Sequence, residues 1–427
     1  MINESLEFLK KNFAIKEKIL KMSLSIENKI CDKFLDIDKI SDYNQLKVLN
    51  SFLEHKVSYT NFTETTGYGY DDYGRDTLEK IYAKIFGCED ALVRHNIISG
   101  THAISLCIFG VLRPNDNLLC ATGKPYDTLI EVLGLNNSRE CSLKSWGINC
   151  FIAELDSQNK IQYEKISKIL KETNPKAILI QKSKGYNFRP SFSNEEIEKI
   201  IKITKKWNEE CICIVDNCYG EFVELKEPTE FGADLIAGSL IKNLGGGFVD
   251  CGGYVAGKKK YVEKASYNLT TVGIGKHAGA SLGFNKNMYR GLFNAPHAVN
   301  QSLKSALFCS EIFSELGFEI CPKTSDKRTD IVQAIKLGSA EKVIKFCQTI
   351  QKNSPVDSHL TLLPSRLPGY VNDIIMASGS FVQGSSIEMS ADAPIIHPYV
   401  VYFQGGTIFS SAKIAIMKAA SEILDMY

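Results

Sequence analysis

The chain has 427 residues, 44% of them hydrophobic and 23% charged, a balance that is typical of a globular protein of two or three domains. Fifty basic and 49 acidic residues leave a formal charge of +1 without long runs of one sign, so nucleic acid and anionic membranes are poor candidates as partners. The N-terminus has no signal-peptide pattern, and the longest apolar runs, of about ten residues, are about half as long as a membrane-spanning helix. We expect a cytoplasmic protein with a small-molecule ligand.

The amino-acid pattern changes twice in the N-terminal part of the chain. Residues 1–60 form a predicted helical arm, because lysine, glutamate, isoleucine and leucine recur at helical spacing without proline. Residues 65–76 (TTGYGYDDYGRD) are rich in turn formers and tyrosine, and a helical period then returns and ends at Gly87. From there, short apolar runs alternate with amphipathic helices, which predicts a large α/β domain over residues 61–300 with a mostly parallel sheet.

Buried strands are predicted from four apolar runs of this domain, at residues 177–181, 211–216, 233–239 and 252–257, with a helix at residues 194–210. From about residue 300 a helical pattern (NQSLKSALFCSEIFSELG) leads into one predicted strand (VVYFQGG) and a last helix (SSAKIAIMKAASEIL). We therefore expect a smaller α+β domain over residues 301–427.

Polar residues close two of the predicted strands. The run CICIV ends in Asp216, and residues 239–247 (SLIKNLGGG) set Ser239 and Lys242 directly after the next run. Functional groups of parallel sheets gather at the carboxyl ends of the strands, so these side chains are candidates for one site. Taken singly, Asp216 also fits a turn cap and Lys242 a solvated turn; their order and spacing favour a shared site.

A second candidate feature is the start of an apolar helix, where Ser99, Gly100, Thr101 and His102 precede the run AISLCIFGVL. Glycine and hydroxyl residues at a helix start offer free backbone N–H groups at the positive end of the helix dipole. A phosphate group fits such a position. A plain helix cap is the simpler alternative.

These segments together resemble the pyridoxal-phosphate enzymes of the aspartate-aminotransferase fold, in particular the carbon–sulfur lyases that act on cystathionine and methionine. Lys242 follows Asp216 by 26 residues and Ser239 by three, as in that family. The closest resemblance is to the bacterial methionine-gamma-lyase-like branch, whose members are often described as aluminium-resistance proteins. It rests on GYGYDDYGRDTLEKIYA, SGTHAI, GVLRPND, GKPYDTL, PSFSNEEI, MASGSFVQGSSIEMSADAP and YFQGG, which span about residues 60–410.

The resemblance implies a role for each candidate residue. Lys242 would form the Schiff base with pyridoxal 5'-phosphate and move the substrate's α-proton, and Asp216 would keep the pyridine nitrogen protonated. Tyr126 would stack on the cofactor ring, whereas His102 would lie beside the cofactor or merely cap its helix. The implied cofactor-binding residues are Ser99, Gly100, Thr101, His102, Tyr126, Asp216, Ser239 and Lys242.

The surroundings of Lys242 carry two further expectations. Its apolar neighbours would favour the neutral amine by desolvation, which a Schiff base needs. The glycines at residues 245–247 would let the backbone turn without crowding the cofactor.

Two groups of residues are candidates for contacts beyond this set. Tyr68, Tyr70 and Arg75 resemble the region that reaches the phosphate in a neighbouring subunit, although their spacing differs, and a surface turn is the alternative. A contact with a neighbouring subunit implies a homodimer or homotetramer with shared active sites. Arg366 and Arg189 are candidates for binding the substrate's α-carboxylate, and Tyr68 is a further candidate near the substrate; both arginines could equally be surface residues.

The favoured reaction is β- or γ-elimination from a sulfur amino acid. Other pyridoxal-phosphate reactions remain open, namely transamination, racemisation and aldol-type cleavage, as does a cofactor-binding stress-resistance protein with little turnover. Residues 252–259 (GGYVAGKK) resemble a phosphate loop but end in lysine where a hydroxyl residue is needed. The 13 cysteines occur singly and the seven histidines are dispersed, so no metal site is predicted.

Overall fold

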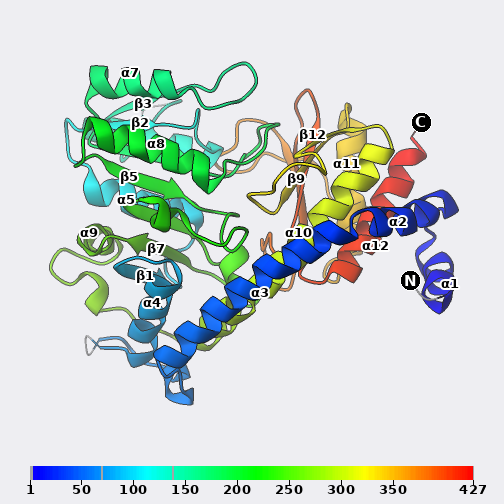
Figure 1. Cartoon of the computed structure of the whole chain (residues 1–427), viewed down its shortest axis with the longest axis horizontal. Coiled ribbons are helices and arrows are strands. Elements are labelled where there is room, and N and C mark those ends of the chain that lie inside the picture. Colours follow the sequence, from blue (N-terminus) through cyan, green and yellow to red (C-terminus); the bar gives the residue numbers. More distant parts are fainter. Residues whose placement is uncertain (1–2, 69–70, 137–138, 427) are drawn as a thin grey trace.

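The structure, a computed structural model, describes residues 3–68, 71–136 and 139–426. It contains a seven-stranded sheet of order β1-β7-β6-β5-β4-β2-β3 and a five-stranded antiparallel sheet of order β10-β11-β12-β9-β8 (Figure 1). The strands of the large sheet are β1 (Asp90–Arg94), β2 (Asn117–Cys120), β3 (Asn149–Ile152), β4 (Ala177–Gln181), β5 (Ile212–Asp216), β6 (Leu235–Ser239) and β7 (Gly253–Gly257). Those of the small sheet are β8 (Glu319–Cys321), β9 (Val332–Lys336), β10 (Ile374–Ala377), β11 (Ser390–Pro394) and β12 (Val400–Gln404).

Helices cover both faces of the large sheet, because each central strand is apolar on both sides. In β5, Ile212 and Ile214 pack with α5, α6 and α9, whereas Cys213 and Val215 pack with α4, α7 and α8. The helices on these two faces are α4 (Tyr73–Ile85), α5 (Gly100–Val111), α6 (Asp127–Leu133), α7 (Tyr163–Thr173), α8 (Asn194–Trp207) and α9 (Lys259–Leu269). The α/β architecture predicted from the sequence, a mostly parallel large sheet with a smaller α+β part, is confirmed.

The large sheet is not parallel throughout. β7 runs antiparallel to β6, and β1 runs antiparallel to β7. Residues 240–252 join β6 to β7 and contain only the short turn η4 (Asn243–Gly245). A parallel connection needs a crossover that is usually a helix, so the chain turns back beside β6 in the opposite direction.

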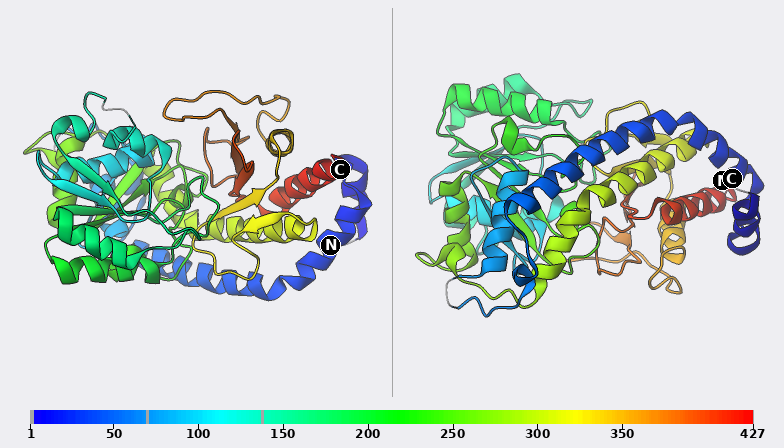
Figure 2. Two further views of the ribbon diagram at one scale, coloured as in Figure 1. Left: turned by 90° about the horizontal axis from the view of Figure 1, so that it is seen from above. Right: turned by 60° about the horizontal axis from the view of Figure 1, so that its bottom comes forward.

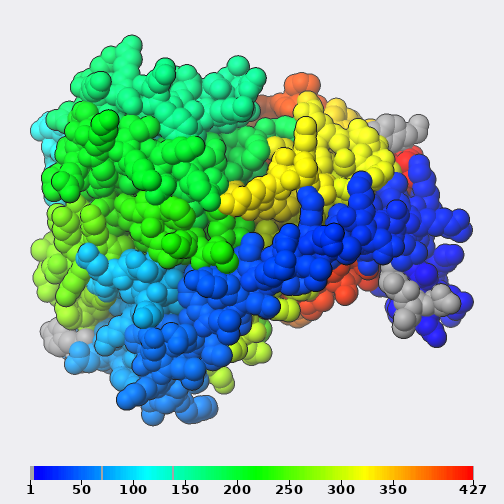
Figure 3. Space-filling view, in the orientation of Figure 1, coloured from blue at the N-terminus to red at the C-terminus, as the bar shows by residue number. Residues whose placement is uncertain are grey.

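Long helices run along the molecule and join its two halves. α10 (Phe284–Glu315) packs against α3 (Cys31–Glu54), and the two lie side by side in both views of Figure 2. In the space-filling view, α3 crosses one face from the large sheet toward the small one (Figure 3). α10 begins well before the helix predicted near residue 300, because Pro296 lies inside it and masks the helical pattern.

The small sheet packs one face on helices and turns the other toward the large domain. Ala391, Ala393, Val401 and Phe403 belong to an apolar core with α10, α11 (Ala340–Lys352) and α12 (Phe409–Leu424). α1 (Asn3–Phe13) and α2 (Glu17–Lys29) lie within the predicted arm, and both join this core. No helix within the described parts of the chain is long and apolar enough to cross a membrane.

Candidate active site

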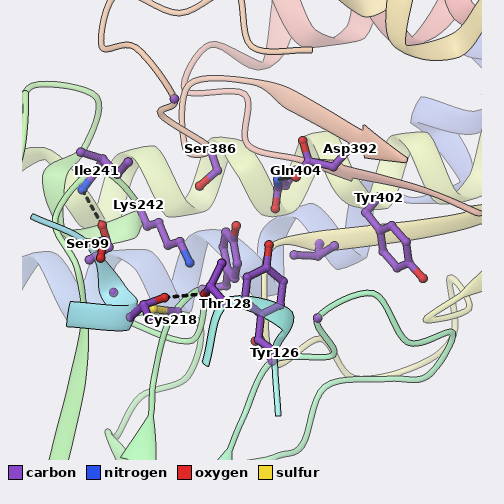
Figure 4. A pocket seen from close by; sticks show the side chains of 18 of the residues that line it. Ser99, Tyr126, Thr128, Cys218, Ile241, Lys242, Ser386, Asp392, Tyr402 and Gln404 are labelled. Carbon is purple, nitrogen blue, oxygen red and sulfur yellow. Dashed lines mark hydrogen bonds between the residues drawn. The ribbon is translucent and has the colours of Figure 1, made fainter. Parts of the chain in front are cut away.

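A cavity of about 350 Å³ lies where the carboxyl ends of β5 and β6 face the small sheet (Figure 4). It brings together predicted site residues that lie up to 143 positions apart in the sequence, from Ser99 to Lys242. The predicted site residues that line it are Ser99, Gly100, Thr101, Tyr126, Asp216, Ser239 and Lys242. The carboxyl ends of the predicted strands therefore meet at one cavity of the fold.

Asp216 and Lys242 form the charged centre of this cavity. Asp216 is the last residue of β5, and its Oδ1 accepts a hydrogen bond from the Cys218 N–H at 3.1 Å. Burial raises the pKa of Asp216, although the Lys242 ammonium acts in the opposite direction. The Nζ of Lys242 lies 3.9 Å from the centroid of the Tyr219 ring, a cation–π contact.

The expected effect of desolvation on Lys242 is present, but it is one of two opposing effects on the pKa of this amine. Burial does act to lower the pKa of Lys242, but the attraction of nearby acidic side chains outweighs it and raises that pKa above its ordinary value. These side chains are Cys218, Tyr219, Asp216 and Glu221, of which Glu221 attracts the ammonium only where its own carboxyl group has ionised.

The N-terminus of α5 forms one wall of the cavity. Ser99 is its N-cap, with Oγ accepting from the His102 N–H at 3.1 Å, while the N–H groups of the first turn have no acceptor within the helix. A Cβ atom on Gly100 would lie 2.9 Å from Cys218 Sγ, so glycine leaves room that any side chain would fill. Ser239 lies opposite, and its Oγ accepts from the Ile241 N–H at 3.3 Å. This arrangement suits a phosphate group.

His102 does not line the cavity. Its Nδ1 accepts a hydrogen bond from the Ile98 N–H at 3.3 Å, and burial lowers the pKa of its imidazole. Of the two roles that the sequence left open, the structure favours the local contact at the helix start over a position beside the cofactor.

Tyrosines from four separate segments surround the remaining space. We call Tyr126, Tyr186, Tyr370 and Tyr402 the tyrosine cluster. The hydroxyl groups of Tyr126 and Tyr370 are 2.5 Å apart, and the Tyr402 hydroxyl donates to the Tyr186 carbonyl oxygen at 2.5 Å. Only Tyr126 was predicted; Tyr402 lies in the motif YFQGG, but the motif did not assign a role to this tyrosine.

The small sheet contributes an acidic group that the sequence prediction missed. In the antiparallel register, Asp392 on β11 stands opposite Tyr402 on β12, and Ser390 stands opposite Gln404. All four side chains line the cavity, since residues two apart share one face of a strand. Gln404 Nε2 donates to Asp392 Oδ2 at 2.9 Å, and burial raises the pKa of Asp392 to about 7. In the sequence, Ser390 and Asp392 alternate with alanines, a pattern that could have predicted two polar side chains on one face of a strand.

Neither arginine predicted to bind the substrate carboxylate reaches the cavity. Arg189 is buried in its own loop: it donates to the Pro190 carbonyl at 2.8 Å and the Ser183 carbonyl at 3.0 Å, and lies on the Phe192 ring. Arg366 is exposed and does not line the cavity. Both predictions rested on residue type and on the place of each arginine in the chain, and the fold directs both side chains elsewhere.

The loop predicted to reach a neighbouring subunit lies away from this cavity. The Arg75 guanidinium is buried and donates to the carbonyl oxygens of Gly279 (3.0 Å) and His277 (3.3 Å) and to Asp76. Tyr68 is 85% exposed. Tyr70 lies outside the described residues. A contribution of these residues to another chain's site stays a prediction.

The side chains of the cavity fit pyridoxal phosphate as a group. A buried carboxylate, a lysine and a helix N-terminus that a Cβ atom would obstruct meet in one space. Ser390 Oγ is buried there without a hydrogen-bond partner among the described residues. Within those residues, no group of three or more histidine, cysteine or acidic side chains could hold a metal ion.

The two sheets and the cavity between them define the aspartate-aminotransferase-like fold. The pyridoxal-5'-phosphate-dependent protein YhfS from Escherichia coli shares it, with a TM-score of 0.62 over 92% of this chain and 97% of that one. The sequence identity is 14%, so this likeness concerns the fold alone.

The chain belongs to the methionine gamma-lyase family, because the model of that family matches residues 19–424. It is 51% identical to the uncharacterized protein YnbB of Bacillus subtilis (strain 168) over 411 residues, which are 96% of this chain and 97% of that protein. A carbon-sulfur lyase involved in aluminum resistance from Clostridium novyi NT is similar in structure, with a TM-score of 0.94, 46% identity, and coverage of 99% and 100% of the two chains. The family inferred from the sequence motifs is confirmed.

Proposed function

We propose that the protein is a pyridoxal-phosphate-dependent carbon–sulfur lyase that eliminates the sulfur substituent of an amino acid such as cystathionine or methionine. The observation that carries the proposal is the meeting of Lys242 and Asp216 in one buried cavity beside the N-terminus of α5. The name of the similar Clostridium novyi protein, a carbon-sulfur lyase, supports the same class of reaction.

The cavity offers a separate partner for each part of the cofactor. Ser99, Gly100, Thr101 and Ser239 would bind the phosphate, and Asp216 would hold a protonated pyridine nitrogen. Tyr126 would support the ring, and Lys242 is the attachment point. When bound, pyridoxal phosphate supplies the electron sink that accepts the charge left on Cα after its proton is removed.

Lys242 is the group that would move the α-proton. Its raised pKa means that the amine must first lose a proton. A cationic partner for Asp216 would cancel part of the attraction that raises this pKa, and so would ease that loss. After proton removal, the Lys242 ammonium is the available donor for the departing sulfur.

We further propose that two copies of the chain share each active site. Among the described residues that line the cavity, Lys242 is the one positively charged side chain, whereas a phosphate and a substrate carboxylate are both anions. A second copy is the natural source of further cations in a symmetric oligomer. The exposed Tyr68 lies on the segment proposed to make this contact.

The experiment begins with the protein purified in the presence of pyridoxal phosphate. We expect a visible absorption band, its loss on borohydride reduction, and a covalent label on Lys242 in the peptide map. Lys242→Ala should lose the label, whereas Lys260→Ala, which changes an exposed lysine outside the cavity, should keep it. A label on another residue, or none, would contradict the proposal.

Turnover separates the proposed lyase from the alternatives. Incubation with L-cystathionine, L-methionine or L-cysteine should release keto acid, ammonia and a thiol without an added acceptor. Keto acid that forms only with an amino-group acceptor would indicate transamination instead. A bound cofactor without any release would indicate a binding protein.

A further inference from the structure

Asp392 is a carboxylate that the proposed chemistry does not use. It lies on β11 in the small-sheet wall of the cavity and, in the view of Figure 4, on the far side of Lys242 from Ser99. Its carboxylate accepts a hydrogen bond from Gln404 at 2.9 Å, and a neutral amide compensates a buried carboxylate only in part. A buried carboxylate is costly unless a cation pairs with it.

The cavity itself offers Asp392 little positive charge. Lys242 is the one cationic side chain among the described lining residues, and it is also attracted to Asp216 at the opposite wall. An anionic group at this position repels the carboxylate end of a substrate. The side chain is therefore placed for a positively charged group of a ligand.

Aromatic rings surround the same part of the cavity. Tyr402 stands directly opposite Asp392 in the sheet register, and its ring lies 5.2 Å from that of Tyr186. The Tyr186 ring lies 5.6 Å from Tyr126 and 6.2 Å from Tyr370. Aromatic faces attract ammonium groups, and a carboxylate among several tyrosines is a recurrent way to bind an organic cation.

We propose that Asp392, with Gln404 and the tyrosine cluster, forms a subsite for an ammonium group at the end of the substrate's sulfur substituent. The inference rests on the proposed lyase function and names its substrate class: sulfur amino acids whose sulfur substituent carries a second amine. The ammonium donates to Asp392 and lies against the tyrosine faces, which sets the sulfur between the two ends of the cavity.

The test compares two amino acids that differ in one group. S-(2-Aminoethyl)-L-cysteine ends in an ammonium where S-propyl-L-cysteine ends in a methyl group of similar size. We expect the wild-type holoenzyme to prefer the first by about 10- to 100-fold in kcat/KM, the range of one charged hydrogen bond. Equal values for the two compounds in the wild type would overturn the subsite without any variant.

Variants assign the preference to the carboxylate. Asp392→Asn should abolish the preference, and Asp392→Glu should retain part of it. The matched control is Asp373→Asn, which removes the same charge from an exposed position of the small domain outside the cavity. An unchanged preference in Asp392→Asn would overturn the proposal.

A second readout keeps this inference distinct from the proposed function. The shift in melting temperature on adding each compound reports binding whether or not turnover occurs. A larger shift with the aminoethyl compound that depends on Asp392, without turnover of either compound, would support the subsite and refute the lyase. Turnover of both compounds with equal shifts would support the lyase and refute the subsite.

Discussion

Glu221 is fully buried beside the active-site cavity. The Tyr254 hydroxyl donates to its Oε1 at 2.9 Å, and its Oε2 has no hydrogen-bond partner among the described residues. Burial raises the pKa of Glu221 to about 8. The folded protein therefore holds this carboxyl group in its neutral form at neutral pH, whereas the unfolded chain ionises it.

Replacing Glu221 should change how stability depends on pH. Between its ordinary pKa of 4.5 and about 8, the folded state binds more protons than the unfolded state, so Glu221 lowers stability as pH rises through this window. Below the window the group has no effect, and above it the penalty is constant. Glu221→Gln should remove the slope, so its unfolding free energy should gain up to about 1.4 kcal/mol per pH unit over the wild type.

The measurement is urea unfolding at pH values from 5 to 8.5. The control is Glu209→Gln, which removes a charge from an exposed position. Parallel curves for the wild type and Glu221→Gln across this range would show that Glu221 titrates normally in the folded protein.

At the scale of elements, the glycine run after Lys242 has a packing role. The expectation that it keeps the cofactor uncrowded is wrong, because these glycines do not line the cavity. A Cβ atom on Gly245 would lie 1.8 Å from the Leu240 carbonyl oxygen, and one on Gly291 of α10 would lie 2.5 Å from the Gly245 carbonyl oxygen. The turn η4 thus sits directly against the α10 backbone.

This close approach predicts an unusual effect of an alanine in a helix. Gly291 lies inside α10, where alanine is intrinsically better than glycine by about 1 kcal/mol. We expect Gly291→Ala nevertheless to destabilise the protein by about 1–3 kcal/mol, since the added methyl group overpacks the contact with η4. Denaturant unfolding measures this, and a stabilised variant would show that the two segments separate at no cost.

The predictability of the site also differs between elements. Asp216 and Lys242 were found because parallel strands end at one edge of their sheet, which is a property of local sequence order. Asp392 was not found, because the inward face of β11 depends on which face packs on α10 to α12. One of the two neighbours of β12, namely β9, is also distant in sequence. The residue types of Arg189 and Arg366 gave no information about where their side chains point in the fold.

At the scale of the whole molecule, a buried ion pair joins the cavity wall to the small domain. Lys184 Nζ donates to both carboxylate oxygens of Asp330 at 2.8 Å, and both side chains are almost fully buried. Lys184 lies between Ser183 and Gly185, which line the cavity, and Asp330 lies just before β9. The pair therefore fixes one wall of the cavity to the sheet that forms another.

Replacing one member of this ion pair should lower the free energy of unfolding more than replacing both members. Lys184→Met leaves the Asp330 carboxylate buried without its cation, and we expect a loss of about 3–5 kcal/mol in the free energy of unfolding. The double variant Lys184→Met/Asp330→Leu should recover a large part of that loss. A double variant with the sum of the two single losses would show that the two side chains act independently.

The proposed sharing of active sites predicts complementation between two inactive variants. Lys242→Ala should be inactive in its own site, and Tyr68→Ala should be inactive if Tyr68 completes the site of a partner. Subunits mixed after mild unfolding and refolding should recover about a quarter of wild-type activity, because half of random dimers are mixed and one of the two sites in each mixed dimer carries neither lesion. Sedimentation equilibrium supplies the oligomeric state, and no recovery from a mixed oligomer would contradict the sharing.

The 32-residue helix α10 takes part in two apolar cores, one on a face of the large sheet and one in the small domain. Ala295, Val299 and Leu303 belong to the core under the large sheet, and Phe308 and Ile312 belong to the core of the small one. The predicted domain boundary at residue 300 therefore falls inside one continuous helix. A fragment cut there would leave half of an apolar helix face bare on each product, so the protein is to be dissected by point substitution rather than by expression of separate pieces.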